Sequence, residues 1–109
     1  MYSASFIYEV KGLDDEYHRL DQLIEEVAHT LPGFLGAEVW HSPDGKRNNA
    51  IYYWKDLDTL KAFSEHPRHM EAKRQYARWY AGFHIVISEV IRSYGDAAFG
   101  HITSDQRQE

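Results

Sequence analysis

The alternation of apolar and polar positions predicts strands at both ends of the chain and a hairpin near its middle. Residues 3–11 alternate, which places every second side chain on one face of a strand. Residues 35–42 alternate again, and residues 50–55 are rich in the aromatic and branched residues that strands favour. Between them, Ser42-Pro43-Asp44-Gly45 has the composition of a tight turn. A last strand-like run covers residues 84–94.

Two other segments have helical periodicity. The acidic run Asp14-Asp15-Glu16 suits a helix N-terminus, where negative charge is favourable, and an apolar stripe from Tyr17 to Leu31 follows it. Pro32-Gly33 is expected to end this helix. Asp56 stands where an N-cap is expected, and the helix that follows is interrupted at Pro67. A second helical piece then shares one face, formed by His69, Ala72, Lys73, Tyr76, Trp79, Tyr80 and Phe83.

The predicted order of elements is β-α-β-β-α-β. This is the ferredoxin-like α+β arrangement, in which a four-stranded antiparallel sheet carries both helices on one face. A chain of 109 residues has apolar material for one core only, so residues 1–95 are expected to form a single domain. Residues 96–109 are polar with weak periodicity. They are expected to be a tail that is either disordered or an arm lying across a partner subunit.

No helix is left to cover the second face of this sheet. In the last strand-like run, Phe83, Ile85 and Ile87 alternate with Val86 and Val90, so both faces carry apolar residues. An uncovered apolar sheet face of several hundred Å² is rare on a soluble monomer. The sequence therefore predicts a homodimer that forms through the sheet.

Composition excludes several classes of function. The net charge of -5 argues against nucleic acid as a partner, because phosphate contacts require clustered Lys and Arg. The chain has no Cys, which excludes disulfides, thiolate nucleophiles and Cys-based metal sites and fits a reducing compartment, so a cytoplasmic location is expected. No run of about 18 apolar residues occurs, so no membrane partner is expected. A glycine-rich phosphate loop is also absent.

Four stretches carry a family resemblance: Leu31-Pro32-Gly33-Phe34-Leu35-Gly36, Tyr53-Trp54-Lys55-Asp56, His66-Pro67-Arg68-His69 and Trp79-Tyr80. Together they resemble the antibiotic biosynthesis monooxygenase family of the dimeric α/β-barrel superfamily. The resemblance runs from about Phe6 to Tyr94. It implies the fold derived above more strongly than it implies one activity, because the family includes cofactor-independent oxygenases of aromatic polyketides, haem-degrading enzymes and signal-molecule enzymes.

The candidate site residues lie on the faces predicted to meet between helices and sheet. His69 is the candidate base, since imidazole titrates near neutral pH, and the alternative is a structural His bonded to backbone at the Pro67 break. Trp54 and Arg78 complete the expected catalytic set, with Arg78 opposing a developing anion or, alternatively, exposed as a solvated charge. The expected substrate-binding residues are Tyr53, Tyr76, Trp79 and Tyr80. Alternation leaves open whether Tyr53, or Tyr52 with Trp54, faces the helices.

The favoured function is a cofactor-independent monooxygenase that oxidises a small aromatic or enolisable substrate with O2, and no metal is expected. Protein side chains do not activate O2 themselves, so the substrate must supply the electrons. The alternative is haem binding or degradation with His69 as axial ligand. The resemblance to haem-degrading relatives implies a Trp and a His at positions that hold Phe63 and Lys73 here. A non-catalytic small-molecule binder is the third possibility.

Overall fold

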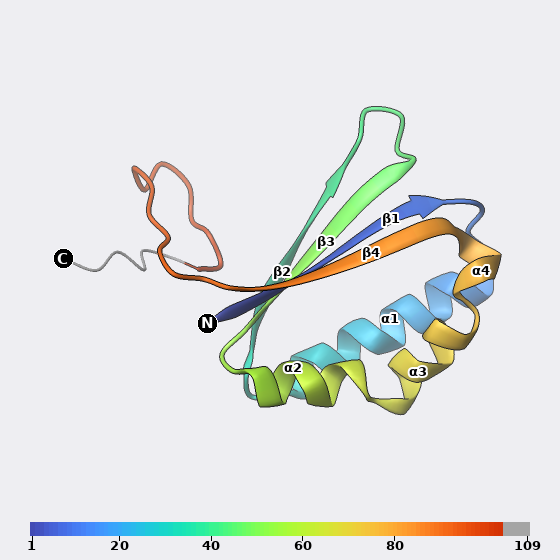
Figure 1. The fold of residues 1–109 in the computed structure, drawn as a ribbon, viewed down its shortest axis with the longest axis horizontal. Coiled ribbons are helices and arrows are strands. Elements are labelled where there is room, and N and C mark those ends of the chain that lie inside the picture. The colour runs from blue at the N-terminus through green and yellow to red at the C-terminus, as the bar shows by residue number, and fades with distance from the viewer. Residues whose placement is uncertain (104–109) are drawn as a thin grey trace.

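The computed structural model describes residues 1–103 and shows a four-stranded sheet with helices on one side (Figure 1). In chain order the elements are β1 (Tyr2–Val10), α1 (Asp15–Thr30), β2 (Phe34–His41), β3 (Arg47–Trp54), α2 (Leu57–Ser64), α3 (Pro67–Arg74), α4 (Tyr76–Trp79) and β4 (Tyr80–Glu89). The strands lie in the order β2-β3-β1-β4, and every neighbouring pair is antiparallel. The predicted ferredoxin-like fold is confirmed.

The strand register decides which side chains face the helices. In the central pair, Tyr2 lies opposite Trp54 and Ala4 opposite Tyr52, and all even-numbered positions of β1 and β3 share the helix side. On the other flank of β1, Tyr8 lies opposite Phe83 of β4. The odd-numbered positions of β1 and β3 form the opposite, helix-free face of the sheet.

The hydrophobic core is concentrated at one end of the layer between sheet and helices. Trp54, Ala28, Leu60 and Phe63 are buried together there, and Trp54 is fully inaccessible. Asp56 begins α2 next to this core, because its carboxylate accepts a hydrogen bond from the backbone N–H of Thr59 at 2.7 Å. The predicted N-cap at Asp56 is confirmed.

The helix break predicted at Pro67 is confirmed: α2 ends at Ser64, and Pro67 begins α3 at its first position, where the missing N–H of proline costs nothing and His66 is the N-cap. One sequence-based boundary was wrong. The last strand begins at Tyr80 and ends at Glu89, so it is shifted from the predicted 84–94. Aromatic residues around position 80 fit both a helical stripe and a strand, and pairing with β1 decides between them.

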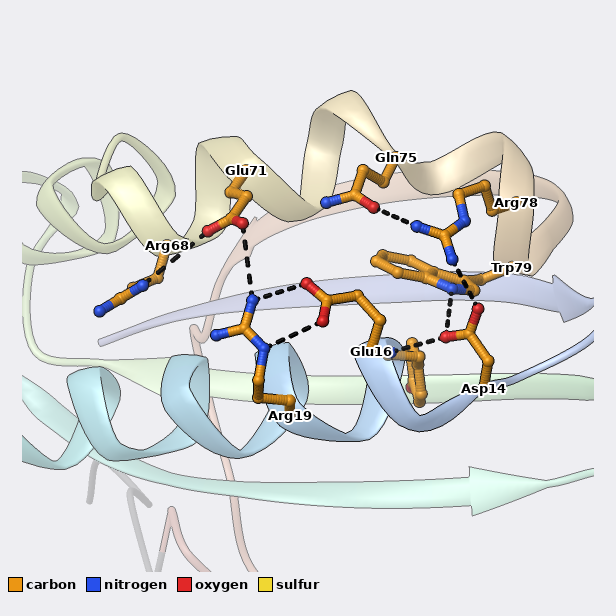
Figure 2. A network of polar contacts seen from close by, with 9 residues as sticks. Asp14, Glu16, Arg19, Arg68, Glu71, Gln75, Arg78 and Trp79 are labelled. Atoms are coloured by element: carbon orange, nitrogen blue, oxygen red, sulfur yellow. Dashed lines mark hydrogen bonds and ion pairs between the residues drawn. The ribbon is translucent and has the colours of Figure 1, made fainter.

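Asp14 joins the beginning of α1 to the segment that leads into β4, as Figure 2 shows. Its carboxylate caps α1 by accepting from the backbone N–H of Tyr17 at 2.9 Å. The same carboxylate accepts from the indole N–H of Trp79 at 2.9 Å and from the guanidinium of Arg78 at 2.8 Å. These bonds, led by the one from Tyr17, hold the pKa of Asp14 below its usual value.

A second group of charges in Figure 2 connects α1 to α3. Arg19 forms two hydrogen bonds with Glu16 and lies 3.7 Å from Glu71, which in turn lies 3.9 Å from Arg68. Such exposed pairs contribute little stability each. The Arg19–Glu71 pair links α1 to α3, and the Asp14 bonds link the beginning of α1 to α4.

Part of the predicted tail lies against β2 and β3. His101 is 3.0 Å from the carboxylate of Glu38, and Ile102 packs so close to Gly36 that an added Cβ would lie 3.1 Å from it. Thr103 is buried. The remaining tail positions, residues 104–109, lie outside the described residues. No helix within residues 1–103 is long and apolar enough to cross a membrane.

Replacing Asp14 by Asn should destabilise the fold, because an amide can still cap α1 but loses the charge that holds Arg78. We expect the melting temperature at pH 7 to fall by about 5 °C. Because the pKa of Asp14 is lowered in the folded state, the stabilisation is present above its ordinary pKa and is lost as the pH falls through the lowered value. The difference in melting temperature between D14N and the wild type should therefore become smaller at acidic pH.

The matched control is Asp15→Asn, which removes the same charge one residue farther along in the first turn of α1. Thermal unfolding followed by circular dichroism should show a clearly smaller shift for D15N. Equal shifts for the two variants would mean that general helix electrostatics, not the Asp14 bonds, stabilise this end of the domain.

Candidate functional site

A cavity of about 350 Å³ lies between the helices and the sheet. Its walls are mostly aromatic and aliphatic, which is typical of sites for small organic ligands. The helices cover the edge strand β4 incompletely. Phe83, Ile85 and Ile87 therefore line the cavity and yet are each about half exposed, at 48%, 47% and 51%. The cavity is open on this side.

His69 lines the cavity from the first turn of α3, two residues after Pro67. Its Nδ1 lies 3.3 Å from the backbone carbonyl oxygen of Phe63, and its ring meets the Phe63 ring edge to face at 4.7 Å. A carbonyl only accepts hydrogen bonds, so Nδ1 carries the proton and Nε2 keeps a free lone pair. Burial, aided by the positive charge of Lys73, lowers the pKa of His69 to about 4. The imidazole is therefore neutral at pH 7.

Lys73 follows His69 by one helical turn and also lines the cavity. Its ammonium group donates to the backbone oxygen and to the hydroxyl of Ser64, both at 3.0 Å. These bonds hold the cation at the His69 end of the cavity. A negative charge that develops on a bound molecule near His69 would be stabilised by Lys73.

Trp54 also lines the cavity, next to Phe63, whose carbonyl lies beside His69. Its ring packs against Phe63 at 4.9 Å and Phe34 at 5.1 Å. The side chain is fully buried, yet its indole N–H has no hydrogen-bond acceptor among residues 1–103. Buried donors are nearly always paired in folded proteins. An unpaired donor beside a cavity suits a ligand that brings an oxygen acceptor with it.

A second group of aromatic residues lines the other end of the cavity, where α1 begins. Tyr8 and Tyr80 contact each other at 4.8 Å, and Tyr17 contacts Tyr80 at 6.0 Å and Trp79 at 5.5 Å. Burial is the main reason that the pKa of each tyrosine is raised, to about 12 for Tyr80. All three hydroxyls are therefore protonated at pH 7. Asp21, one turn after Tyr17 on α1, borders this end.

The structure brings together five of the seven predicted site residues, and these five line the cavity: Trp54, His69, Tyr76, Trp79 and Tyr80. Arg78 lies outside the lining, because its guanidinium pairs with Asp14 and with Gln75 at 2.5 Å. Tyr53 points to the helix-free face, where its hydroxyl donates to Glu38 at 2.6 Å. Between the alternatives left open for β3, Tyr52 and Trp54 face the helices.

The lining residues that sequence reasoning missed as site candidates include the polar residues Tyr8, Tyr17, Asp21 and Lys73. The sequence pattern indicated the positions of the two tyrosines. Tyr8 shares one face of its strand with Phe6, and Tyr17 is the first residue of the apolar stripe of α1. Asp21 follows the buried Leu20 and gave no such signal. The position of Lys73 on the cavity-facing side of α3 was visible, but a charge at that position is more often solvated.

The lining offers little to a metal ion. No group of three or more His, Asp or Glu residues within residues 1–103 could hold one. For haem, Nε2 of His69 is the available nitrogen. Phe63 stands where the haem-degrading pattern implies a Trp, and it is packed into the core with 6% exposure. Lys73 stands where that pattern implies a His.

Comparison with known proteins agrees with the fold. Protein YqjZ of Bacillus subtilis, whose activity is uncharacterised, is 29% identical over 93 residues, covering 84% of this chain and 81% of YqjZ. SnoaB of Streptomyces nogalater, described as a cofactor-independent oxygenase, has a similar structure with a TM-score of 0.70 at 13% identity, covering 84% of this chain and 94% of SnoaB.

A Nitrosomonas europaea protein, provisionally named an antibiotic biosynthesis monooxygenase, matches with a TM-score of 0.68 at 19% identity, covering 84% of this chain and 99% of that protein. At these identities the solved structures show a shared fold. The family match comes from sequence: the model of the monooxygenase af470-like family fits residues 7–87, about three quarters of the chain. The protein belongs to the monooxygenase af470-like family.

Proposed function

We propose that this protein is a monooxygenase that oxidises a small aromatic or enolisable substrate with O2 in the aromatic cavity, without a cofactor. One observation carries the proposal: Trp54, whose buried indole N–H has no acceptor among residues 1–103, lines the same cavity as neutral His69 and cationic Lys73. A donor, a base and a positive charge around one apolar space suit a substrate that becomes an oxygen-bearing anion. The description of SnoaB as cofactor-independent supports the absence of a cofactor.

In the proposed reaction, Nε2 of His69 accepts a proton from an acidic C–H group of the substrate. The resulting carbanion reduces O2, a C–O bond forms, and protonated His69 returns its proton to the peroxide oxygen to give a substrate hydroperoxide. Loss of water from the hydroperoxide breaks the O–O bond and leaves a carbonyl group. The CH2 group and O2 become C=O and H2O, so the substrate supplies all the electrons and no external reductant is consumed.

The roles of Lys73 and Trp54 follow from the weak basicity of His69. A base with a pKa of about 4 removes a carbon-bound proton only if the anion is strongly stabilised. Lys73 supplies a positive charge. In the proposed complex the indole of Trp54 shifts enough for its N–H, which has no acceptor among residues 1–103, to donate to the substrate oxygen on which negative charge accumulates.

Trp54→Phe and His69→Gln should each reduce oxidation of the test substrate anthrone, whose CH2 group gives an electron-rich anion. The phenylalanine keeps an aromatic ring but removes the indole N–H, and glutamine removes the base. Loss of either function should lower kcat by about a hundredfold. Oxygen-electrode traces and the absorbance of the anthraquinone product measure the rate.

Trp40→Phe is the matched control, since Trp40 is 63% exposed on the helix-free face, and it should retain wild-type activity. An absorption spectrum before and after haem titration tests the main alternative. A Soret shift that disappears in His69→Gln would contradict the cofactor-free proposal. Anthrone binding without any O2 uptake would favour a non-catalytic binder.

The pKa of His69 predicts an acid dependence that can be measured without substrate. The unfolded chain takes up the proton near pH 6.5 and the folded chain only near pH 4, so stability falls as the pH drops through this window. The lost free energy of unfolding is roughly 3 kcal/mol. Urea denaturation of His69→Gln should lack this loss, whereas His84→Gln, at an exposed position on the other face, should retain it. An NMR titration of His69 near pH 6.5 would contradict the expectation.

We also propose that the helix-free face of the sheet packs against the same face of a second copy. Trp40 and Val86 are exposed on this face, at 63% and 41%, and Ile7 and Ile51 lie between them in the strand register. The Oδ1 atom of Asn49, on the same face, is buried without a donor among residues 1–103. Pairing with a second copy would remove exposed apolar surface and can supply the missing donor.

Val86→Lys should therefore shift the protein towards a monomer in sedimentation velocity runs, because the charge would be buried in the interface. Ile87→Lys is the matched control: it is the next residue of β4, similarly exposed, but faces the helix side. A wild-type protein that sediments as a monomer at high micromolar concentration would overturn the proposed dimer.

A further inference from the structure

The end of one short helix holds both the base and the cation of the cavity. α2 ends at Ser64, and the last backbone carbonyls of a helix lack partners within it and carry partial negative charge. The carbonyl oxygen of Phe63 lies 3.3 Å from Nδ1 of His69, and that of Ser64 accepts from Nζ of Lys73 at 3.0 Å. These contacts bring His69, Lys73 and Ser64 together, and all three line the cavity. Ser64 has no part in the reaction proposed above.

The protons of Lys73 and Ser64 are not all used within the protein. An ammonium group has three protons, and Lys73 gives at most two of them, to the backbone oxygen and the hydroxyl oxygen of Ser64. The hydroxyl oxygen accepts in this contact, so the hydroxyl proton is left to donate elsewhere. Neither this proton nor the third proton of Lys73 has an acceptor among residues 1–103. The pair therefore offers two donors to a molecule in the cavity.

These donors are neither closed off by packing nor neutralised by an acidic residue. Ser64 is half-buried and Lys73 is exposed. No carboxylate of residues 1–103 forms an ion pair with Lys73, and Asp21 on α1 is the one carboxylate among the described residues of the lining. Lys73 also polarises the Ser64 hydroxyl, because a hydroxyl whose oxygen accepts from a cation becomes a stronger donor.

A carbonyl oxygen is the ligand group that fits two such donors. It accepts two hydrogen bonds and donates none. A ligand amine would bring further donors instead of an acceptor. An anion would lose its hydration on entering a space lined mainly by apolar side chains. A neutral ketone satisfies the pair and avoids both costs.

We propose that Ser64 and Lys73 bind the carbonyl oxygen of an enolisable aromatic ketone, and that Ser64 is a catalytic residue. When Nε2 of His69 removes a proton from carbon, the electron pair of that C–H bond moves into the conjugated system. The C=O bond becomes a C–O single bond, and negative charge collects on the oxygen. Ser64 and Lys73 keep their protons and bind this oxygen more strongly than they bind the ketone. The proton removal rests on the proposed function, whereas the carbonyl site does not.

Benzophenone and diphenylmethane test the carbonyl site without any reaction. Both have two phenyl rings joined by one carbon, which is a carbonyl in benzophenone and a CH2 group in diphenylmethane. The loss of one hydrogen bond in Ser64→Ala should weaken benzophenone binding to the full chain about fivefold. Lys73→Met, which removes a charged donor, should weaken it about twentyfold. Diphenylmethane should bind both variants as it binds the wild type. Equilibrium dialysis gives the dissociation constants.

The infrared C=O stretch of bound benzophenone reports the donors directly. A carbonyl that accepts hydrogen bonds absorbs at lower frequency, and a heavy-isotope label on the carbonyl carbon separates its band from those of the protein amides. The band of the wild-type complex should lie below that of benzophenone in hexane. It should move up in Ser64→Ala and stay in place in Ser64→Thr, which keeps a hydroxyl.

Ser5→Ala is the matched control, because it removes the same hydroxyl from another residue of the lining, on the odd-numbered face of β1. It should change neither the band nor the affinity for benzophenone.

Oxidation of anthrone tests the catalytic role of Ser64. Ser64→Ala should lower kcat about tenfold, because the lost hydrogen bond is stronger in the anion than in the ketone. Ser64→Thr should stay within about twofold of the wild type.

The proposal is overturned if the C=O band does not move in Ser64→Ala, if Ser64→Ala and Ser5→Ala weaken benzophenone binding equally, or if benzophenone does not bind. Equal weakening of benzophenone and diphenylmethane in Ser64→Ala would also overturn it, since the shape of the cavity would then have changed. A Ser64-dependent band without any O2 uptake refutes only the oxygenase proposal. His69-dependent O2 uptake with an unmoved band refutes only the carbonyl site.

Discussion

The cavity exists because the helices are too few to cover the sheet. A single layer of helices packs tightly over the Trp54 end, where Ala28 and Phe63 exclude solvent, but it leaves the apolar side chains of β4 half exposed. Close packing throughout would have filled this space and gained more stability. The Asp14 bonds to Trp79 and Arg78 keep α1 and the α3–α4 segment in place around the opening. Most of what the site can do follows from this incomplete coverage.

Within the cavity, the environment changes the ordinary chemistry of familiar residues. An exposed histidine titrates near neutral pH, but burial beside a cation makes His69 a neutral base throughout the physiological range. The pKa values of the tyrosines change in the opposite direction. Burial and a nearby carboxylate raise them, so the hydroxyl groups stay protonated. The cavity thus offers one weak base, one cation and several neutral donors. This combination of groups favours a ligand that binds in its neutral form and becomes charged inside the cavity. A ligand that is already charged in solution is less favoured.

The fold was predictable from sequence because strand alternation and helix caps are local signals. Alternation over residues 3–11 predicted the strand β1, and Asp14 and Asp56 marked the starts of α1 and α2. The site was less predictable, because side-chain direction depends on packing between distant segments. Arg78 was a candidate to oppose a developing anion, with a solvated charge as the alternative, yet Asp14, 64 residues earlier, binds its guanidinium. Tyr53 and Tyr52 could be separated only by the register with β1.

The three tryptophans occupy three different environments, which gives the protein a built-in optical reporter. Trp40 is exposed to water, Trp79 is buried and hydrogen-bonded to Asp14, and Trp54 is buried with an N–H that has no acceptor among the described residues. The fluorescence of an indole shifts to longer wavelength as its surroundings become more polar. Trp54 lies in the least polar surroundings of the three, so it emits mainly at the short-wavelength edge of the spectrum. A molecule that enters the cavity and accepts its hydrogen bond changes that edge. Occupancy can therefore be followed without a label.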